Sequence, residues 1–368
     1  MRFSCPSQVL SHALSTVTRA LSARSTLAIY EGVCLLADED GLKLTGSDGA
    51  ITIMTKIDAD IQEQGSVVLP GKLFYEVIRK MPQSEVKVEV GKTFAATVKC
   101  MGSRTTIAGQ PGTAYPALPE IGMGNTFDLP QPMLKNMIQQ TNFAISTDET
   151  RMILTGSLME IQQGELRLVS LDGFRLAMRL ERISEYAPAL EAIIPARTLI
   201  EISKLLSDDE DSLCTLQIAD RLVMITFGET KMISQLIAGE FIRYRQIMPA
   251  DFKTKLKVDR QALIMCVERA SLMAREGKNN LIKLTIEDGR LVITSNSESG
   301  DAYEELNADV TGDELVIAFN VRYIQDVLRA VEDDEVVMCF NTPVSPCLIV
   351  PVSGDAFTHL VLPVRLGA

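Results

Sequence analysis

Histidine, tryptophan and nucleotide-binding motifs are scarce or missing in this sequence of 368 residues, and this narrows the possible functions. Tryptophan does not occur, and the two histidines, His12 and His359, lie far from any nucleophile motif. The sequence has no G-x-x-x-x-G-K-[ST], G-x-S-x-G or G-x-G-x-x-G pattern. Acidic clusters at 38–40 and 208–211 separate apolar segments, which is typical of solvated loops rather than of a metal site. We therefore predict a protein that is not an enzyme and that uses no cofactor or metal.

Cysteine pairs and long apolar runs are also missing. The cysteines are odd in number and never have C-x-x-C spacing, which argues against a disulfide framework or a zinc site; they are Cys5, Cys34, Cys100, Cys214, Cys266, Cys339 and Cys347. No stretch approaches the roughly 18 apolar residues of a membrane span, and Pro6 and His12 interrupt what would otherwise resemble a signal peptide. We expect a cytoplasmic location and no membrane partner.

What the sequence does contain is a threefold repeat. The stretch 165–180, ELRLVSLDGFRLAMRL, predicts two strands joined by a two-residue Asp172-Gly173 turn. Weaker copies at 41–53 and 289–300 place Asp48 and Asn296 in the equivalent position, 124 residues away on either side. A second landmark, at Pro70, Pro195 and Asn320, repeats every 125 residues at a strand-to-helix junction. The period predicts three domains, with boundaries 1–120, 121–250 and 251–368.

Each repeat has two segments with apolar residues at helical spacing, and more numerous strands with alternating residues. The predicted helices are 7–22, 72–81, 131–141, 196–206, 259–278 and 320–331. Because hairpins join the strands, the fold class is predicted to be α+β, with two helices packed on antiparallel sheet in each domain.

The predicted helices differ in charge from the rest of the chain. They carry thirteen basic and six acidic residues, whereas the whole chain has a net charge of −12. If the helices share a face, that face attracts a polyanion while the remaining surface repels it. Without a base-reading motif, any contact with a nucleic acid is expected to be to the backbone and independent of sequence. Ordinary amphipathic helices with solvated polar faces are the alternative.

Several stretches resemble the beta subunit of bacterial DNA polymerase III, the beta sliding clamp. They are the opening MRF, LSARST around Arg24, VSLDGFRLA, EFIRYRQIMP at 240–249, FNVRYIQDVL at 319–328 and the closing HLVLPVRL. The resemblance covers the whole chain. It implies a processivity factor in which two chains form a head-to-tail ring around duplex DNA. The implied partners are double-stranded DNA, a second copy of the chain, the polymerase III catalytic subunit, an ATP-driven clamp loader, and other replication and repair proteins with clamp-binding peptides.

The resemblance also implies a mostly apolar cleft that binds partner peptides. The matching positions are Leu154, Leu171, Gly173, Phe174, Arg175, Leu176, Ile242, Gln246, Ile247, Asn320, Tyr323, Val344, Pro346, Leu360, Leu362, Pro363, Val364, Arg365 and Leu366. The sequence departs from the familiar pattern at Phe174, Ile242, Gln246 and Val364, so the preferred peptide is expected to differ. We predict that 362–366 forms a strand at a sheet edge or a bulge, because Pro363 cannot donate to a ladder.

Two further sets of residues follow from the resemblance. Positions expected to contact DNA are Arg24, Lys72, Arg79, Lys80, Arg151 and Arg197. Positions expected at the joint between two chains are Arg104, Ile107, Leu272, Met273, Glu298, Glu304 and Glu305. Two interpretations of another class stay open: an acidic three-unit interaction scaffold that never encircles DNA, and an enzyme with a diffuse carboxylate site.

Overall fold

The structure is a computed structural model that describes residues 1–22, 27–277 and 280–366. The chain divides into two compact units. Unit 1 contains residues 1–133 and 204–236, and unit 2 contains residues 134–203 and 237–368. The units are described separately below.

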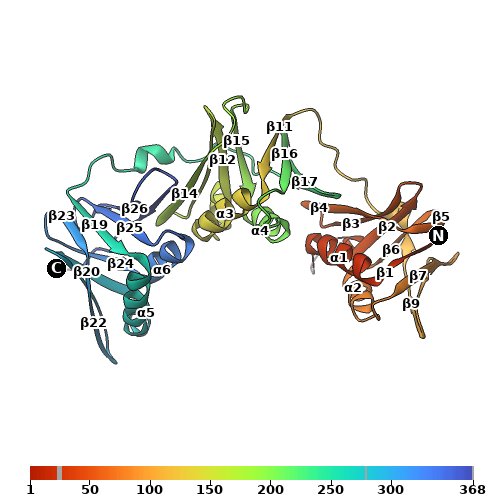
Figure 1. Ribbon diagram of the computed structural model, residues 1–368, viewed down its shortest axis with the longest axis horizontal. Helices are drawn as coiled ribbons and strands as arrows, with labels where there is room; N and C mark the ends of the chain where they lie inside the picture. Colours follow the sequence, from red (N-terminus) through yellow and green to blue (C-terminus); the bar gives the residue numbers. More distant parts are fainter. Residues whose placement is uncertain (23–26, 278–279, 367–368) are drawn as a thin grey trace. The chain divides into compact units, whose positions relative to one another are not determined.

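Unit 1 contains two antiparallel sheets (Figure 1). The first has five strands, in the order β5 (Asp60–Glu63), β1 (Arg2–Pro6), β7 (Glu85–Val90), β8 (Ala96–Cys100) and β9 (Ser103–Ile107). The second has nine, in the order β10 (Gln110–Pro111), β6 (Gly65–Pro70), β2 (Gly32–Asp38), β3 (Gly41–Ser47), β4 (Ile51–Ile57), β18 (Thr230–Gln235), β17 (Leu222–Phe227), β16 (Leu213–Ala219) and β11 (Asn125–Pro130).

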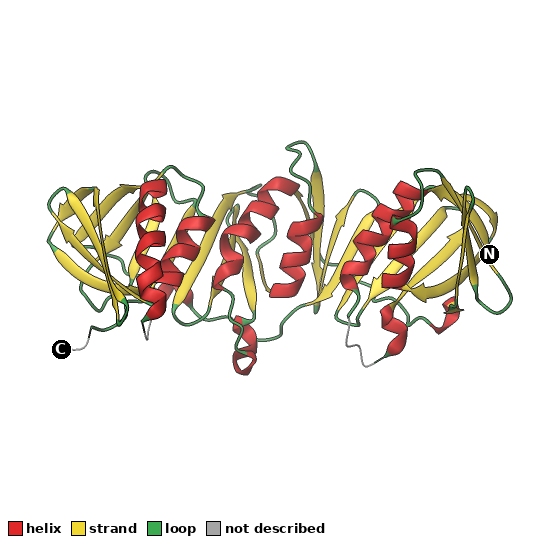
Figure 2. Cartoon of the chain, turned by 90° about the horizontal axis from the view of Figure 1, so that it is seen from below, coloured by secondary structure: helices red, strands yellow, loops and turns green. Residues whose placement is uncertain are grey.

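Two helices of unit 1 pack against each other and against these strands: α1 (Ser7–Val17) and α2 (Gly71–Arg79) (Figures 1 and 2). Leu10, Leu14 and Val17 bury one face of α1, and Phe74 and Ile78 bury one face of α2. The apolar spacing in the sequence therefore marks the buried side of each helix. After Val17 the chain continues as a short 3₁₀ turn, Thr18–Ala20, instead of the α-helix predicted to residue 22.

Unit 2 also contains a nine-stranded sheet, followed by a four-stranded one, and both are antiparallel. The larger runs β15 (Leu190–Pro195), β12 (Gly156–Gln162), β13 (Glu165–Leu171), β14 (Arg175–Arg182), β27 (Phe357–Val361), β26 (Cys347–Pro351), β25 (Glu335–Phe340), β19 (Thr254–Asp259) and β23 (Asp309–Gly312). The smaller runs β22 (Gly300–Asn307), β21 (Arg290–Ser297), β20 (Leu281–Glu287) and β24 (Leu315–Asn320).

Helices α5 (Arg260–Glu276) and α6 (Val321–Ala330) pack together over a core in unit 2 that includes Phe319 and Phe340. Each begins at a side-chain cap: Asp259 accepts from the backbone N–H of Ala262, and Asn320 from that of Arg322. Such caps satisfy donors that the first helical turn leaves free. The two remaining helices are α3 (Gln131–Thr141) and α4 (Ala196–Leu205). All six predicted helices are present, and the α+β class with antiparallel sheets is confirmed.

The repeat extends to the way each nine-stranded sheet is joined. In unit 1, β4 pairs with β18, and Ile51 lies opposite Ser234. In unit 2, β14 pairs with β27, and Arg175 lies opposite Val361. In both cases the ladder includes the first residue of the strand that follows the hairpin, and the partner strand comes from a much later part of the sequence.

The hairpin turns differ in detail from the prediction. The backbone N–H of Asp172 donates to the carbonyl of Arg175 at 3.2 Å, so the central turn residues are Gly173 and Phe174 rather than Asp172 and Gly173. Gly173 has a φ of 95°, a conformation that favours glycine. The Asp48 turn is built in the same way. In the third copy Asn296 lies within β21, and Ser297 and Gly300 close the turn.

The carboxyl-terminal prediction was wrong in one respect. Strand β27 ends at Val361, and residues 362–366 do not continue it. Two backbone hydrogen bonds hold this segment, from Leu362 to the carbonyl of Phe174 and from Val364 to the carbonyl of Ala318, each at 2.8 Å. Pro363, which has no N–H to donate, lies between them. The domain boundaries near residues 120 and 250 stay predictions.

Candidate functional site

Unit 2 exposes a group of large apolar side chains that all belong to the predicted peptide cleft. They are Phe174, Ile242, Ile247, Val344 and Leu366. Exposed apolar side chains are common singly, but a group of them indicates a binding surface. We call the predicted cleft positions in unit 2 the apolar surface.

A buried cluster supports this surface. It contains four of the predicted positions, Leu154, Leu171, Leu176 and Leu360, which come from β13, β14, β27 and the segment before β12. Phe241 and Tyr244, from the segment after Ile237, are buried in the same cluster, and Leu362 packs against it. The fold therefore brings together residues that are more than two hundred positions apart in the sequence, such as Leu154 and Leu360. Val344 and Pro346 lie in the turn before β26, whose Leu348 belongs to the cluster.

Arg175 is a charged residue among the predicted cleft positions, and it contacts two aromatic rings and two carboxylates. Its guanidinium group lies 4.7 Å from the ring centroid of Tyr323 and 5.3 Å from that of Phe143. The same group pairs with the carboxylates of Asp172, at 3.0 Å, and Asp326. A planar cation between two rings and two carboxylates is held in one orientation, which a lysine could not reproduce. Phe174 stacks on Tyr323 at a centroid distance of 6.0 Å, so the hairpin and α6 meet here.

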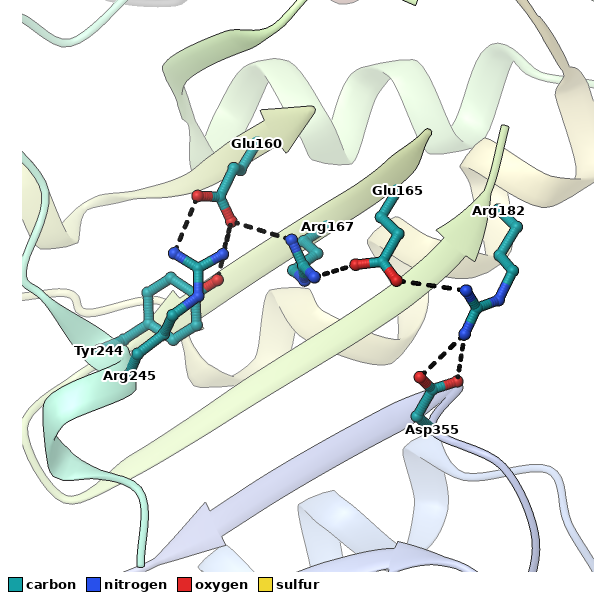
Figure 3. Close-up of polar contacts among 7 residues, drawn as sticks. All are labelled: Glu160, Glu165, Arg167, Arg182, Tyr244, Arg245 and Asp355. Carbon is teal, nitrogen blue, oxygen red and sulfur yellow. Dashed lines mark hydrogen bonds and ion pairs between the residues drawn. The ribbon is translucent and has the colours of Figure 1, made fainter. Parts of the chain in front are cut away.

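Glu160 is a buried charge that the sequence analysis did not select. Glu160 lies on β12, and only 3 % of its surface is exposed to solvent. Arg245 binds it with both ends of the guanidinium group, Tyr244 donates its hydroxyl proton at 2.9 Å, and Arg167 lies 3.6 Å away (Figure 3). Burial alone would raise the pKa of Glu160, but the hydrogen bonds from Arg245 and Tyr244 outweigh burial and lower this pKa below its ordinary value.

The position of these contacts gives them a role at the apolar surface. Tyr244 and Arg245 belong to the turn Tyr244–Ile247, which also carries Gln246 and Ile247. Glu160 therefore fixes the turn that presents two predicted cleft residues. The network continues from Arg167 to Glu165, from Glu165 to Arg182, and from Arg182 to Asp355 in the loop before β27 (Figure 3).

The predicted DNA contacts lie mainly on exposed helix positions. Lys72 and Lys80 are exposed at the two ends of α2, and Arg79 is exposed but pairs with Glu76 at 2.7 Å. Arg24 lies outside the described residues. Arg197 is exposed in the first turn of α4.

Arg151 contacts the hairpin instead of pointing away from the protein. Its guanidinium group donates to the carbonyl of Asp172 at 3.2 Å and pairs with Asp148 at 3.3 Å. A Cβ added at Gly173 would meet the Arg151 guanidinium group at 2.9 Å, so both a positive φ and close packing favour glycine here.

The predicted joint residues lie on or near two sheet edges. Strand β9, with Arg104, is an edge of the five-stranded sheet in unit 1. Strand β22, with Glu304 and Glu305, is an edge of the four-stranded sheet in unit 2. Leu272 and Glu298 are exposed, and Met273 is half-buried.

Three joint residues have surroundings that the prediction did not anticipate. Ile107 is buried in its own unit, which leaves little of its side chain for a second chain. Glu304 is bound by Arg269 of the same chain at 2.9 Å, and Glu305 accepts the hydroxyl proton of Tyr303 at 2.8 Å. Arg104 would therefore have to compete with partners from the same chain for these carboxylates.

Within the described ranges, no group of three or more His, Cys, Asp or Glu residues is arranged to hold a metal ion. No helix in the same ranges is long and apolar enough to cross a membrane.

Family models match nearly the whole chain in three consecutive parts. Residues 1–119 match the N-terminal domain of the DNA polymerase III beta subunit, residues 128–242 its central domain, and residues 245–365 its C-terminal domain.

Individual proteins give the same result. The chain is 36 % identical over 362 residues to the beta sliding clamp of Staphylococcus aureus, with 96 % of each chain covered. It superposes on a DNA polymerase sliding clamp from Bacillus subtilis with a TM-score of 0.97 at 32 % identity and full coverage of both chains. A sliding clamp from Pseudomonas aeruginosa, solved bound to griselimycin, gives a TM-score of 0.94 at 27 % identity, also with full coverage.

Proposed function

Because the chain belongs to the family of DNA polymerase III beta subunits, the beta sliding clamps, we propose that two copies form a ring around duplex DNA and tether partner proteins through the apolar surface. The chain is a processivity factor for DNA polymerase and has no catalytic activity of its own. Its partners are DNA, the polymerase and other proteins that bind through a peptide.

The partner peptide is proposed to bind the apolar surface of unit 2. The observation that carries this assignment is that each exposed apolar residue lies within four positions along the chain of a residue in or packed against one buried cluster: Phe174 near Leu176, Ile242 and Ile247 near Tyr244, Val344 near Leu348, and Leu366 near Leu362. Apolar peptide side chains gain free energy by covering such residues, and Arg175 and Gln246 offer polar anchors. Once a partner is held, its next encounter with DNA is effectively intramolecular, which is the physical origin of processivity.

We propose that the DNA backbone contacts a basic face of the helices that includes Lys72 and Lys80 on α2. Contacts between exposed lysines and phosphates are weak individually and carry no sequence information. Such contacts let the ring slide, while topology rather than affinity keeps it on the duplex.

The ring is proposed to close by pairing the β9 edge of one chain with the β22 edge of the next. An unpaired edge presents free N–H and C=O groups, and two such edges on different units suit a head-to-tail joint. Leu272 would add apolar contact beside it. We place the protein in the cytoplasm, where its seven cysteines, all free thiols, would remain reduced.

Loading onto nicked circular DNA tests the ring directly. After loading by an ATP-driven clamp loader, the protein should stay on the circle at a salt concentration that removes ordinary DNA-binding proteins. Linearising the circle should release it. Retention after linearisation would show ordinary binding and overturn encirclement.

A further inference from the structure

Unit 1 has a cavity of about 460 Å³ that the proposed function does not use. Its floor is one face of β2, β3, β4 and β18, and its cover is the segment Tyr115–Leu118, which we call the strap. Leu36, Met54 and Leu118 supply apolar walls, and Lys43, Lys56 and Lys231 supply positive charge. The volume lies in the usual range for ligand sites. We call it the strap cavity.

The internal repeat shows why this space is open. Leu36 and Lys43 lie opposite each other on β2 and β3, as Glu160 and Arg167 do on β12 and β13, 124 residues later. In unit 2, Tyr244 and Arg245 cover that pair and Glu160 is buried. In unit 1, Leu36 is 41 % exposed. The same sheet position is therefore buried by the chain itself in unit 2, whereas in unit 1 the strap covers it only in part and leaves the cavity.

The segment that covers the equivalent sheet position in unit 2 indicates which ligand would fit the strap cavity. There the face is covered by a segment of polypeptide that inserts the aromatic ring of Tyr244. In unit 1 the apolar walls Leu36 and Met54 offer an equivalent seat for an aromatic or long aliphatic side chain. A ring of this kind gains most when it is buried on several sides.

The strap cavity is lined by three lysines and one acidic residue. Lys43 and Lys56 are cross-strand neighbours, an arrangement of like charges that destabilises a sheet. Lys43 is partly neutralised by Asp38, at 2.7 Å, and Asp40, at 3.2 Å. Asp38 also interacts electrostatically with Lys56 at longer range, but among the described residues neither Lys56 nor Lys231 forms an ion pair within 4.0 Å. Glu229 is the acidic residue that lines the cavity, so the lining is net positive on a chain with a net charge of −12. This pattern complements a carboxylate.

We propose that the strap cavity is a second docking site, which binds a partner peptide that carries an aromatic or long aliphatic side chain next to a carboxylate. The side chain enters between Leu36, Met54 and the strap. The carboxylate lies toward Lys56 and Lys231. This site is separate from the apolar surface of unit 2, and its occupation does not depend on DNA.

The test uses the full chain labelled with ¹³C at the methionine methyl groups. The probe is the peptide acetyl-Glu-Tyr-Glu-Tyr-Glu-amide, and Met54→Leu identifies the Met54 signal. Titration should shift the Met54 signal and leave that of Met178, the residue at the equivalent position in unit 2, unchanged. A shift of Met178 alone, or of neither, would overturn the proposal.

A second experiment reverses the charge of two lysines that line the strap cavity. Lys56→Glu combined with Lys231→Glu should weaken probe binding roughly tenfold or more, whereas Lys283→Glu, an exposed strand lysine in unit 2, should have no effect. The peptide acetyl-Lys-Tyr-Lys-Tyr-Lys-amide should bind more weakly than the acidic probe. Equal binding of the two peptides would overturn the charge argument. If phenylacetate shifts Met54 as strongly as the acidic peptide at the same concentration, the cavity selects a small anion and the peptide assignment is wrong.

Discussion

Arg245 binds the buried carboxylate of Glu160 through two parallel contacts, 3.0 Å from Nη1 to Oε1 and 2.6 Å from Nη2 to Oε2 (Figure 3). This geometry joins β12 to a turn more than eighty residues later in the chain. Paired charges of this kind are stable only while both members are present, because each alone would be a desolvated, uncompensated ion. The contact therefore decides the position of Gln246 and Ile247 beside the apolar surface.

Glu160→Gln should weaken binding of a partner peptide and reduce the free energy of unfolding by about 3 kcal/mol, since it leaves Arg245 and Arg167 without their buried partner. Fluorescence anisotropy with a labelled clamp-binding peptide and chemical denaturation measure the two effects. Glu120→Gln, at an exposed position, is the control. Unchanged peptide affinity in a folded Glu160→Gln protein would show that the turn does not need this anchor.

Arg175→Lys should lower peptide affinity about tenfold, because an ammonium group cannot stack between Phe143 and Tyr323 while it also pairs with two carboxylates. Arg182→Lys is a matched control, since Arg182 is a more exposed arginine with two acidic partners. Equal loss of affinity in both variants would contradict a specific role for Arg175.

Removal of Pro363 and all following residues should abolish peptide binding with little loss of stability. The deletion removes the hydrogen bond from Val364 to Ala318, worth about 1 kcal/mol, and keeps the one from Leu362 to Phe174. Peptide binding and thermal melting are measured on the same protein. A large fall in melting temperature would mean that the segment is structural, and undiminished affinity would remove it from the proposed site.

Lys72→Glu combined with Lys80→Glu should shorten retention on nicked circular DNA and flatten its salt dependence, because two phosphate contacts become repulsive. Both lysines are exposed at α2, so folding should be preserved. Lys87→Glu combined with Lys92→Glu, both exposed in unit 1, changes the net charge by the same amount and is the control. If all three proteins are retained equally at low salt, α2 does not face the DNA.

His359 makes stability depend on pH. Burial lowers the pKa of this histidine to about 3, well below its value in an unfolded chain. Protonation therefore favours the unfolded state, and the contribution of His359 to stability is complete above about pH 6.5 and is lost as pH falls toward 3.

The expected loss is about 1.4 kcal/mol per pH unit within that window. His359→Leu should show a shallower fall in unfolding free energy between pH 6.5 and 5 than the parent protein. His12→Leu, at the other histidine, is the control. Parallel curves for parent and His359→Leu would show that the ring is solvated or protonated in the folded state.

Local patterns in the sequence predicted the helices and hairpins well. The apolar spacing from Val321 to Leu328 marks the buried face of α6, and Asn320 is its cap. The sequence pattern predicted the central residues of the Asp172 turn one position too early. Asp172 precedes the two central residues, and one oxygen of its carboxylate accepts hydrogen bonds from the N–H groups of Phe174 and Arg175. The alternation of apolar and polar residues predicts the strands, but it does not predict which residue closes the turn between them.

Contacts between distant segments were beyond such patterns. Glu160 stands within the apolar run SLMEI, and a charge in a buried strand signals a partner. Only the fold shows that the partner is Arg245. Ile107 shows a different limit: family resemblance implies a place at the joint between chains, which stays a prediction, whereas only the fold shows that its side chain on β9 is buried in its own unit.

The joining of the nine-stranded sheets has a consequence for how the chain is made. The edge of β4 is complete once Ile57 is synthesised, but its neighbour β18 begins at Thr230. At bacterial rates of translation this edge waits roughly ten to thirty seconds for its partner. The edge of β14 waits for β27, which ends seven residues before the end of the chain. A nascent chain that stops before Phe357 therefore leaves one edge of β14 unpaired, since β13 pairs only with the other edge. Ribosome stalling late in this message should yield aggregation-prone fragments rather than shortened but folded protein.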